Sequence, residues 1–267
     1  MGKPSAGTAY VVLRTVGELL VTAGIVVLLF VGYALYVTDL TAANRQRSAN
    51  NELDQAFSAS PMERRRPQLT VGKPFARLYV PAFGQDYQFA VVEGVDREQL
   101  ATGPGHYPHS ARPGEPGNFA VAGHRVGKGA PFRRVDELRS CDAIVVETNS
   151  DFLVYRVLPM ADERATWEAH QRKDPRCARV PVLSGEYRQV VGRKIVEPDR
   201  ADAVAAVPYQ PKTALPIAQQ NALLTLTTSH PEYGNSQRMI IHAVLTDQVG
   251  KRGKAGYPTL LRQIGGR

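Results

Sequence analysis

Ser229, His124 and Arg238 are residues of the types that acyl transfer needs. Such a reaction uses a nucleophile, a proton shuttle and a group that holds the developing oxyanion. In "LLTLTTSHPEYGNSQRMIIHAVL", residues 223–245, Ser229 ends one apolar run and Arg238 begins the next, while His124 follows "NFAVAG" directly. Side chains at strand ends beside loops are exposed on a rigid scaffold. The competing interpretation gives all three ordinary structural roles: a serine bonded to nearby backbone, a surface histidine and a loop-capping arginine.

The segments that must position these residues are short strands separated by turn signals. Residues 97–103 and 131–140 have helical character, and the Gly- and Pro-rich stretch 104–117 predicts an irregular loop. Residues 159–187 are charged and carry the single Trp, which we interpret as a surface insertion. About eight strands predict a mainly β barrel or sandwich with one or two short helices. The predicted strands cover residues 75–83, 87–94, 118–123, 143–148, 152–158, 188–198, 222–228 and 238–246.

An uncharged apolar segment, "LLVTAGIVVLLFVGYALYV" (19–37), precedes the β-rich region. As a helix it is about 28 Å long, close to the roughly 30 Å hydrocarbon core of a bilayer. A cleavable signal peptide has a shorter apolar core of about 7–15 residues, so we expect an uncleaved transmembrane anchor. Lys3 and Arg14 before the span are balanced by Arg45 and Arg47 after it, so basic residues leave the orientation open.

The predicted organisation places one folded domain between polar flanks. Residues 41–74 are polar and lack a sustained period, which is typical of a linker or stalk. The predicted segments are an N-terminus (1–14), a transmembrane anchor (15–38), a linker (39–74), a folded domain (75–249) with its insertion at 159–187, and a basic tail (250–267).

Composition and motifs argue against several other function classes. The net charge is +8, but the basic clusters at 62–69 and 250–258 only flank the folded region, so nucleic acid is not an expected partner. The "HYPH" stretch (106–109) has no companion ligands at zinc spacing, and no phosphate loop or dinucleotide fingerprint occurs, so no cofactor or metal is expected. Cys141 and Cys177 are either bonded or free thiols.

Two motifs resemble a known family. "LTLTTSHPEYGNSQRMIIHA" is similar to the sortase signature, a TLxTC motif followed by a loop and an arginine, with Ser229 standing where sortases have cysteine. "GPGHYP…GEPGNFAVAGHR" resembles the segment around the essential sortase histidine. The pattern is most similar to class E sortases of high-GC Gram-positive bacteria, and the resemblance runs from about Phe75 to Asp247 apart from 159–187.

The resemblance implies an eight-stranded β-barrel held outside the membrane by an N-terminal helix. It implies cleavage of an LAxTG- or LPxTG-like sorting signal between Thr and Gly, and transfer of the acyl group to an amine of the cell wall or a pilin. By position, His124 is then the acid/base, Arg238 the oxyanion stabiliser and Ser229 the seat of the nucleophile. Tyr107 and Thr228 are the expected substrate contacts, with Tyr107 reading the second residue of the signal. Some sortases use calcium, but no carboxylate cluster in this sequence argues for it.

The serine at position 229 sets this chain apart from that pattern. A cysteine thiol has a pKa near 8.5 and is partly ionised at neutral pH, whereas a serine hydroxyl needs an oriented base. The chain order His124, Asp136, Ser229 permits a serine triad, although nothing in the sequence places Asp136 beside His124. Ser229 is therefore either a replacement that silences a sortase or the mark of a relative that has lost catalysis. Both predict slow or absent acyl transfer, and both are compatible with a non-catalytic peptide-binding module on the same fold.

Overall fold

The first element in the computed structural model is one long helix, α1 (Ala6–Ser58), and the structure describes residues 6–58, 69–127, 129–251 and 256–264. Its segment Tyr10–Tyr33 is long and apolar enough to cross a membrane. This span starts earlier than the expected 15–38 and therefore includes Arg14, whose side chain forms an i,i+4 ion pair of 2.8 Å with Glu18. A single apolar helix near the N-terminus is consistent with a membrane anchor.

The expected linker is the first point where the structure differs from the sequence-based prediction. Helix α1 continues through Ser58, and the compact unit that holds the β-strands begins at Ala42. Ala42, Gln46 and Leu53 lie on one side of this helix and are 3%, 8% and 1% exposed. Residues 42–58 are thus regular structure that packs against the domain, and only 59–68 of the predicted linker fall outside the described residues.

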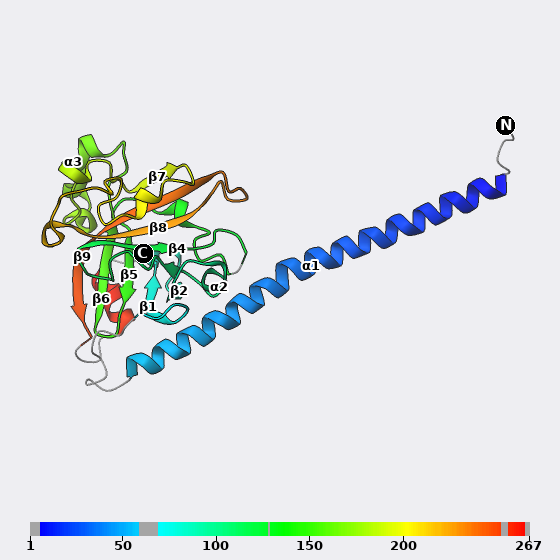
Figure 1. Ribbon diagram of the computed structural model, residues 1–267, viewed down its shortest axis with the longest axis horizontal. Coiled ribbons are helices and arrows are strands. Elements are labelled where there is room, and N and C mark those ends of the chain that lie inside the picture. The colour runs from blue at the N-terminus through cyan, green and yellow to red at the C-terminus, as the bar shows by residue number, and fades with distance from the viewer. Residues whose placement is uncertain (1–5, 59–68, 128, 252–255, 265–267) are drawn as a thin grey trace. The chain divides into compact units, whose positions relative to one another are not determined.

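The β-strands form a closed barrel, as predicted (Figure 1). The sheet order is β6-β5-β1-β2-β3-β4-β8-β9-β7, and an additional β6–β9 pairing closes the barrel. Strand β9 (Gln237–Gly250) makes this closure possible because its first part pairs with β7 and its later part with β6. The other strands are β1 (Pro74–Tyr79), β2 (Gln88–Glu93), β3 (Gly105–His106), β4 (Gly117–Ala122), β5 (Ala143–Glu147), β6 (Asp151–Val157), β7 (Arg193–Val196) and β8 (Ala222–His230).

Alternating apolar residues fill the barrel interior, as the period-2 pattern of the strands requires. Leu224 and Leu226 of β8 point inward, as do Met239 and Ile241 of β9, and all are almost fully buried. Two local predictions were less accurate. The stretch 104–117 contains the two-residue strand β3, and 131–140 contains only a single 3₁₀ turn, η2 (Val135–Glu137), instead of a helix.

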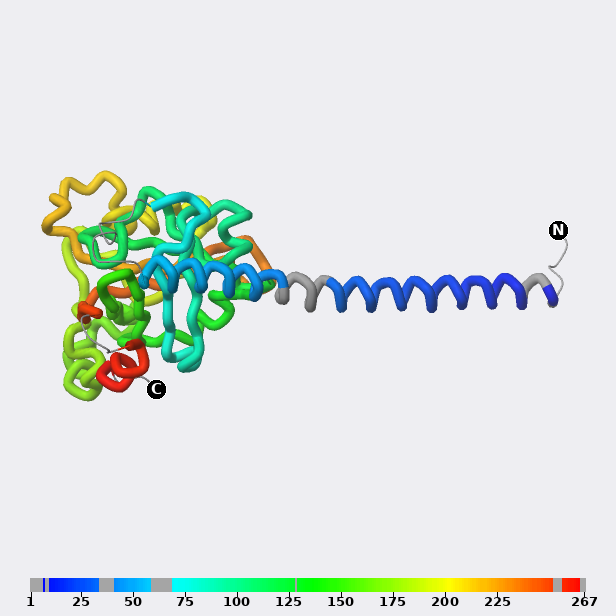
Figure 2. The backbone as a smooth tube through the Cα atoms, turned by 90° about the horizontal axis from the view of Figure 1, so that it is seen from below, coloured from blue at the N-terminus to red at the C-terminus, as the bar shows by residue number. Residues whose placement is uncertain are grey.

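Gln46 attaches α1 to the barrel by acting as a strand partner for β2. Its side-chain amide donates to the Ala90 carbonyl at 3.1 Å and to the Thr102 carbonyl at 2.9 Å, while its oxygen accepts from the Ala90 N–H at 2.9 Å. Strand β3 is too short to reach this part of β2, so Gln46 satisfies the free backbone groups there. The Gln46 Nε2 atom fits because Gly103 has no side chain. Figure 2 shows this end of α1, in light blue, lying along the barrel.

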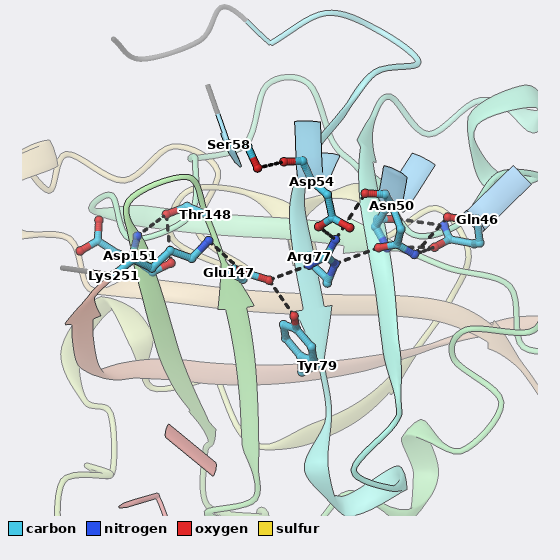
Figure 3. A network of polar contacts seen from close by, with 11 residues as sticks. Gln46, Asn50, Asp54, Ser58, Arg77, Tyr79, Glu147, Thr148, Asp151 and Lys251 are labelled. Carbon is cyan, nitrogen blue, oxygen red and sulfur yellow. Dashed lines mark hydrogen bonds and ion pairs between the residues drawn. The ribbon is translucent and has the colours of Figure 1, made fainter. Parts of the chain in front are cut away.

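A second polar attachment centres on Arg77 of β1 (Figure 3). The Arg77 guanidinium donates to Asn50 Oδ1 at 2.8 Å and Asp54 Oδ1 at 2.5 Å on α1, and to Glu147 Oε2 at 3.1 Å on β5. The Tyr79 hydroxyl donates to the same Glu147 oxygen at 2.7 Å. Burial acts to lower the pKa of Arg77, but the bond to Asp54 and the neighbouring Tyr79 and Glu147 together raise it, whereas burial raises the pKa of Tyr79. The network joins α1, β1 and β5.

The segment 159–187 is more than a surface insertion, because it has a core of its own. It contains helix α3 (Trp167–Lys173), and the Trp167 indole donates to the Val180 carbonyl at 2.7 Å. This core packs against the outer face of β8 and β9, where Leu223 and Ile240 are buried with it. A Cys141–Cys177 disulfide fastens the segment to the turn before β5. The disulfide resolves the question that the sequence left open.

Reduction of this disulfide is expected to lower the melting temperature by about 10 °C. Closing a loop with a sequence separation of 36 residues is worth about 3–4 kcal/mol through the restricted unfolded chain, and 1 kcal/mol shifts the melting temperature of a domain this size by about 2–4 °C. Thermal unfolding with and without a phosphine reductant measures the shift, and the Cys141→Ala/Cys177→Ala double variant is the control. An unchanged melting temperature with both thiols titratable contradicts the expectation.

The predicted basic tail also contains ordered structure. Helix α4 (Tyr257–Gln263) packs against the barrel through Leu260, which is 3% exposed. The Tyr257 ring stacks on Tyr79 with centroids 3.9 Å apart. Residues 252–255 and 265–267 of the predicted tail lie outside the described residues.

Candidate active site

Three neighbouring strands bring His124, Ser229 and Arg238 to one end of the barrel. Strands β4 and β8 are parallel, so both end on the same side, and antiparallel β9 begins there. Ser229 and Arg238 are direct partners in the β8–β9 ladder. The β4–β8 ladder ends at Ala122 and Thr227, and continuing its register by two residues places His124 level with Ser229.

All three positions belong to the outer face of the barrel. Residues that alternate with them along the strands, such as Phe119, Leu226 and Met239, line the interior. Because side chains alternate between faces, His124, Ser229 and Arg238 fall on the opposite side. Each is half-buried. The structure thus pairs Ser229 with Arg238 directly and puts His124 two residues beyond the end of the neighbouring β4, and we refer to these three positions as the row.

The loop between β8 and β9 holds the Arg238 guanidinium. Its Nη1 atom donates to Asn235 Oδ1 at 2.7 Å and to the Gln237 carbonyl at 3.0 Å. A guanidinium has five N–H donors in a planar fork, so bonds through one nitrogen orient the group and leave its other edge for an anionic oxygen.

Tyr107 contacts β8 next to the row, two residues before Ser229. Its hydroxyl is 3.0 Å from Thr227 Oγ1, and Thr227 precedes Ser229 by two residues on the same face. The Thr228 side chain is 4% exposed, and its hydroxyl donates to the Gly123 carbonyl at 2.8 Å. That bond ties β8 to the residue before His124, so the Thr228 side chain offers little surface to a substrate.

Asp136 forms an ion pair with Arg125, whereas a serine triad would need it to bond His124. Its Oδ2 atom lies 2.8 Å from Arg125 Nη2, and the side chain is 44% exposed. A triad acid orients its histidine through a direct bond to Nδ1. The Asp136 carboxylate therefore pairs with Arg125, the residue after His124.

The "HYPH" stretch contributes a structural histidine. His106 is buried, with Nδ1 at 2.6 Å from Glu93 Oε2 and Nε2 at 2.8 Å from Ser110 Oγ. These contacts use both ring nitrogens. Within the described parts of the chain, no three His, Cys, Asp or Glu side chains gather closely enough to hold a metal ion.

A buried polar chain on the same outer face was not anticipated from the sequence. His242 bonds to Thr225 Oγ1 at 2.8 Å and to the Tyr209 hydroxyl at 2.9 Å, and Thr225 donates to Asn118 Oδ1 at 2.6 Å. Burial, with a smaller effect of Lys194, lowers the pKa of His242 to about 3. The alternating pattern of β8 and β9 does place Thr225 and His242 on the Ser229 face, and a polar residue inside an apolar strand was the available signal.

The neutral state of His242 is expected to make stability depend on pH. Its pKa falls from 6.5 to about 3 on folding, so between these values the unfolded chain binds a proton that the folded chain does not. The free energy of unfolding should therefore fall as pH is lowered, by up to about 1.4 kcal/mol per pH unit from this group. Denaturant unfolding between pH 7 and 5 should show a shallower dependence in His242→Gln. Equal slopes in the two proteins contradict this assignment.

Comparison with known proteins gives the family. The sortase domain family model matches residues 78–246. The chain belongs to the sortase family. It is similar to sortase SrtE1 of Streptomyces coelicolor, with 29% identity over 72% of this chain and 59% of that protein, so the match spans less than two thirds of that relative. Sortase SrtE2 of the same organism is 27% identical over 73% of this chain and 86% of its own length.

Solved sortase structures share the barrel. The SrtF sortase from Corynebacterium diphtheriae aligns with a TM-score of 0.67 and 40% identity, covering 76% of this chain and 98% of that one. Sortase E from Streptomyces avermitilis aligns with a TM-score of 0.50 and 28% identity, covering 71% and 99%. The Streptomyces relatives support the predicted similarity to class E.

Proposed function

We propose that the row His124–Ser229–Arg238 is a sortase transpeptidase site that lacks its thiol. Its substrate is an LAxTG- or LPxTG-like sorting signal, cleaved between Thr and Gly, and the acceptor is an amine of the cell wall or a pilin. The observation that supports the proposal is that the β8–β9 hairpin pairs Ser229 with Arg238, while β4, about 100 residues earlier in the chain, ends beside it just before His124. As the chain stands, Ser229 makes transfer slow or absent.

The row accounts for each step of the reaction in a form that carries a thiol. The nucleophile attacks the Thr carbonyl carbon as a thiolate while His124 holds the proton, and the Arg238 guanidinium stabilises the negative oxygen of the tetrahedral intermediate. The C–N bond to Gly breaks, and His124 gives a proton to the leaving amine. The acceptor amine then attacks the acyl-enzyme, His124 takes up its proton, and the nucleophile is released.

Ser229 blocks the first of these steps. A hydroxyl becomes a strong nucleophile only when an oriented base removes its proton. Asp136, the acid that could orient His124 in a serine triad, is paired with Arg125 instead. This geometry favours a transpeptidase site that is inactive with Ser229 over a working serine transpeptidase.

Two residues beside the row receive different roles. For Tyr107 we infer contact with the second residue of the signal, because its hydroxyl lies 3.0 Å from Thr227 Oγ1, two residues before Ser229. For Thr228 we infer a role in positioning the end of β8 against the residue before His124, because its hydroxyl donates to the Gly123 carbonyl.

The setting proposed for this site is the outer surface of a membrane. Tyr10–Tyr33 would anchor the chain, with the barrel on the extracytoplasmic side and surface proteins bearing sorting signals as partners. The Cys141–Cys177 disulfide supports this location, because such bonds persist in oxidising compartments.

The second candidate function is a non-catalytic, membrane-tethered module that binds peptides or assembles partners. Ser229 itself favours it, because strand and loop contacts to a peptide do not require a thiol. A fluorescently labelled LAxTG peptide and its scrambled version, titrated against the full chain in detergent, test both candidates. We expect selective binding that is equal in Ser229→Ala, without cleavage.

These outcomes test both candidates together, and the Ser229→Cys variant separates them, because only a transpeptidase site should gain cleavage from the thiol. Cleavage of the peptide by the unaltered protein contradicts a site that is inactive with Ser229, and absence of selective binding contradicts both candidates. Labelling of Ser229 by a fluorophosphonate probe would instead indicate a serine hydrolase.

A further inference from the structure

Arg125, the residue after His124, carries a guanidinium that is buried next to the proposed site. Its side chain is 5% exposed. Burying a cation is costly unless it is paired, and Arg125 has two side-chain partners. Nη2 lies 2.8 Å from Asp136 Oδ2, and Nη1 lies 3.3 Å from His230 Nδ1. Arg125 Nε is buried with no partner among the described residues. The contacts to Asp136 and His230 are therefore the ones that hold the guanidinium in position.

The contact with His230 spans the two strand ends that hold the site. Arg125 follows His124 after β4 ends, and His230 follows Ser229 at the end of β8. The β4–β8 ladder stops before this point, its last bond running from the Gly123 N–H to the Thr227 carbonyl at 3.1 Å. Beyond it, the Arg125–His230 contact is a side-chain clamp between the two segments.

Asp136 completes the clamp from a third segment. It lies in the turn η2, and the Asp136 backbone carbonyl accepts a hydrogen bond from Arg193 of β7. The carboxylate is thus anchored at its own backbone while it binds Arg125. A planar guanidinium can reach a carboxylate and an imidazole at once, which the single ammonium of lysine cannot do with the same geometry.

We propose that Arg125 is a positioning residue that holds His124 and the side chain at position 229 within reach of each other, with Asp136 orienting its guanidinium. The inference rests on the proposed function and deepens it. Arg125 does not touch the substrate. It fixes the separation between proton shuttle and nucleophile, and a misplacement of about 1 Å can cost about 100-fold in rate.

The test uses the full chain in detergent with Ser229→Cys as the parent. Arg125→Met, Arg125→Lys and Asp136→Asn are added singly. Arg134→Met, which removes an exposed ion pair with Glu137 from the same segment, is the matched control. Each protein is measured for kcat and KM with an LAxTG peptide, for the rate of alkylation of the thiol by iodoacetamide, and for its melting temperature.

Arg125→Met and Arg125→Lys are expected to lower kcat by about 100-fold while KM changes little. Asp136→Asn should lower kcat less, by about tenfold, because Arg125 keeps His230. Alkylation should slow by up to about tenfold in the Arg125 variants, because the thiolate loses its aligned imidazolium. Arg134→Met should behave as the parent.

Folded Arg125 variants that keep the parent kcat and alkylation rate overturn the proposal. So does a loss of kcat that only follows the unfolded fraction in thermal unfolding. If the parent itself does not cleave the peptide, the proposed function fails, but alkylation still reports on Arg125 because it requires no sorting signal. An alkylation rate that is the same in parent and variants then overturns the positioning role separately.

Discussion

The Ser229→Cys variant is expected to cleave an LAxTG peptide and to transfer its acyl part to an added amine, at least about 1000-fold faster than the unaltered protein. Loss of a nucleophile costs enzymes up to about a million-fold in kcat, and a thiol with a pKa near 8.5 reacts without the strong base that serine needs. Position 229 faces Arg238 directly in the β8–β9 ladder, so the new thiol would lie beside the proposed oxyanion-stabilising group. Peptide cleavage with and without the amine, followed by chromatography, measures both activities.

Matched variants make this result specific to the site. Ser236→Cys places a thiol on an exposed position of the β8–β9 loop and should remain inactive. Adding His124→Ala or Arg238→Ala to the Ser229→Cys protein should remove most of the gain. A folded Ser229→Cys variant that binds the peptide without cleaving it shows that His124 and Arg238 are not a working pair, and the binding module becomes the better account.

A soluble protein that begins at residue 42 is expected to melt about 10 °C above one that begins at residue 69. The longer protein keeps the helical turns that bury Ala49 and Leu53 against the barrel. It also keeps Asn50 and Asp54, which bind Arg77. Lost apolar burial and charge-assisted bonds together amount to about 3–5 kcal/mol, and each kcal/mol is worth about 2–4 °C at this size.

Single substitutions in the longer protein separate this docking from general effects of truncation. Leu53→Ala and Gln46→Ala should each reproduce part of the loss, because Leu53 is 1% exposed and Gln46 bonds to both backbone groups of Ala90. Arg47→Ala, on the exposed side of the same helix, should leave the melting temperature unchanged. Equal melting temperatures for the two lengths would show that residues 42–58 are not part of the folded domain.

The site was largely readable from the sequence because its chemistry follows strand ends. A period-2 pattern shows where β8 ends and β9 begins, and if the loop joins them as adjacent antiparallel strands, Ser229 lies beside Arg238, as the ladder has it. The position of His124 required the motif, since nothing local in the sequence pairs β4 with β8, about 100 residues later in the chain. Parallel pairings between distant strands leave no signature in either segment.

The docked part of α1 was missed because its buried stripe contains few large apolar side chains. Ala42, Gln46, Ala49, Leu53 and Phe57 recur at helical spacing, but two are alanines and one is a glutamine. Gln46 is buried only because β3 is too short to pair fully with β2. The burial of Gln46 depends on a tertiary contact with the backbone of β2. From the sequence alone, a glutamine is expected to be exposed to solvent.

The segment 159–187 was misjudged for a related reason. Its charged residues lie on the surface, while its buried positions, such as Trp167 and Val180, are scattered over short turns without a single period. Its other partner is the outer face of β8 and β9, which an alternating strand pattern suggests is open to solvent. A second core on the outside of a barrel can be recognised only when the positions of 159–187 and of the β8–β9 hairpin in the fold are both known.

The central claim, that the row is an acyl-transfer site complete except for its thiol, is tested most directly by trapping the acyl-enzyme. Full-length Ser229→Cys is incubated with an LAxTG peptide without amine, and intact and fragment masses are measured. We expect the peptide acyl group, ending at Thr, on the fragment that contains position 229, released by added amine and absent from Ser229→Ala. A folded, peptide-binding Ser229→Cys protein that forms no adduct, or forms it elsewhere, would contradict the account.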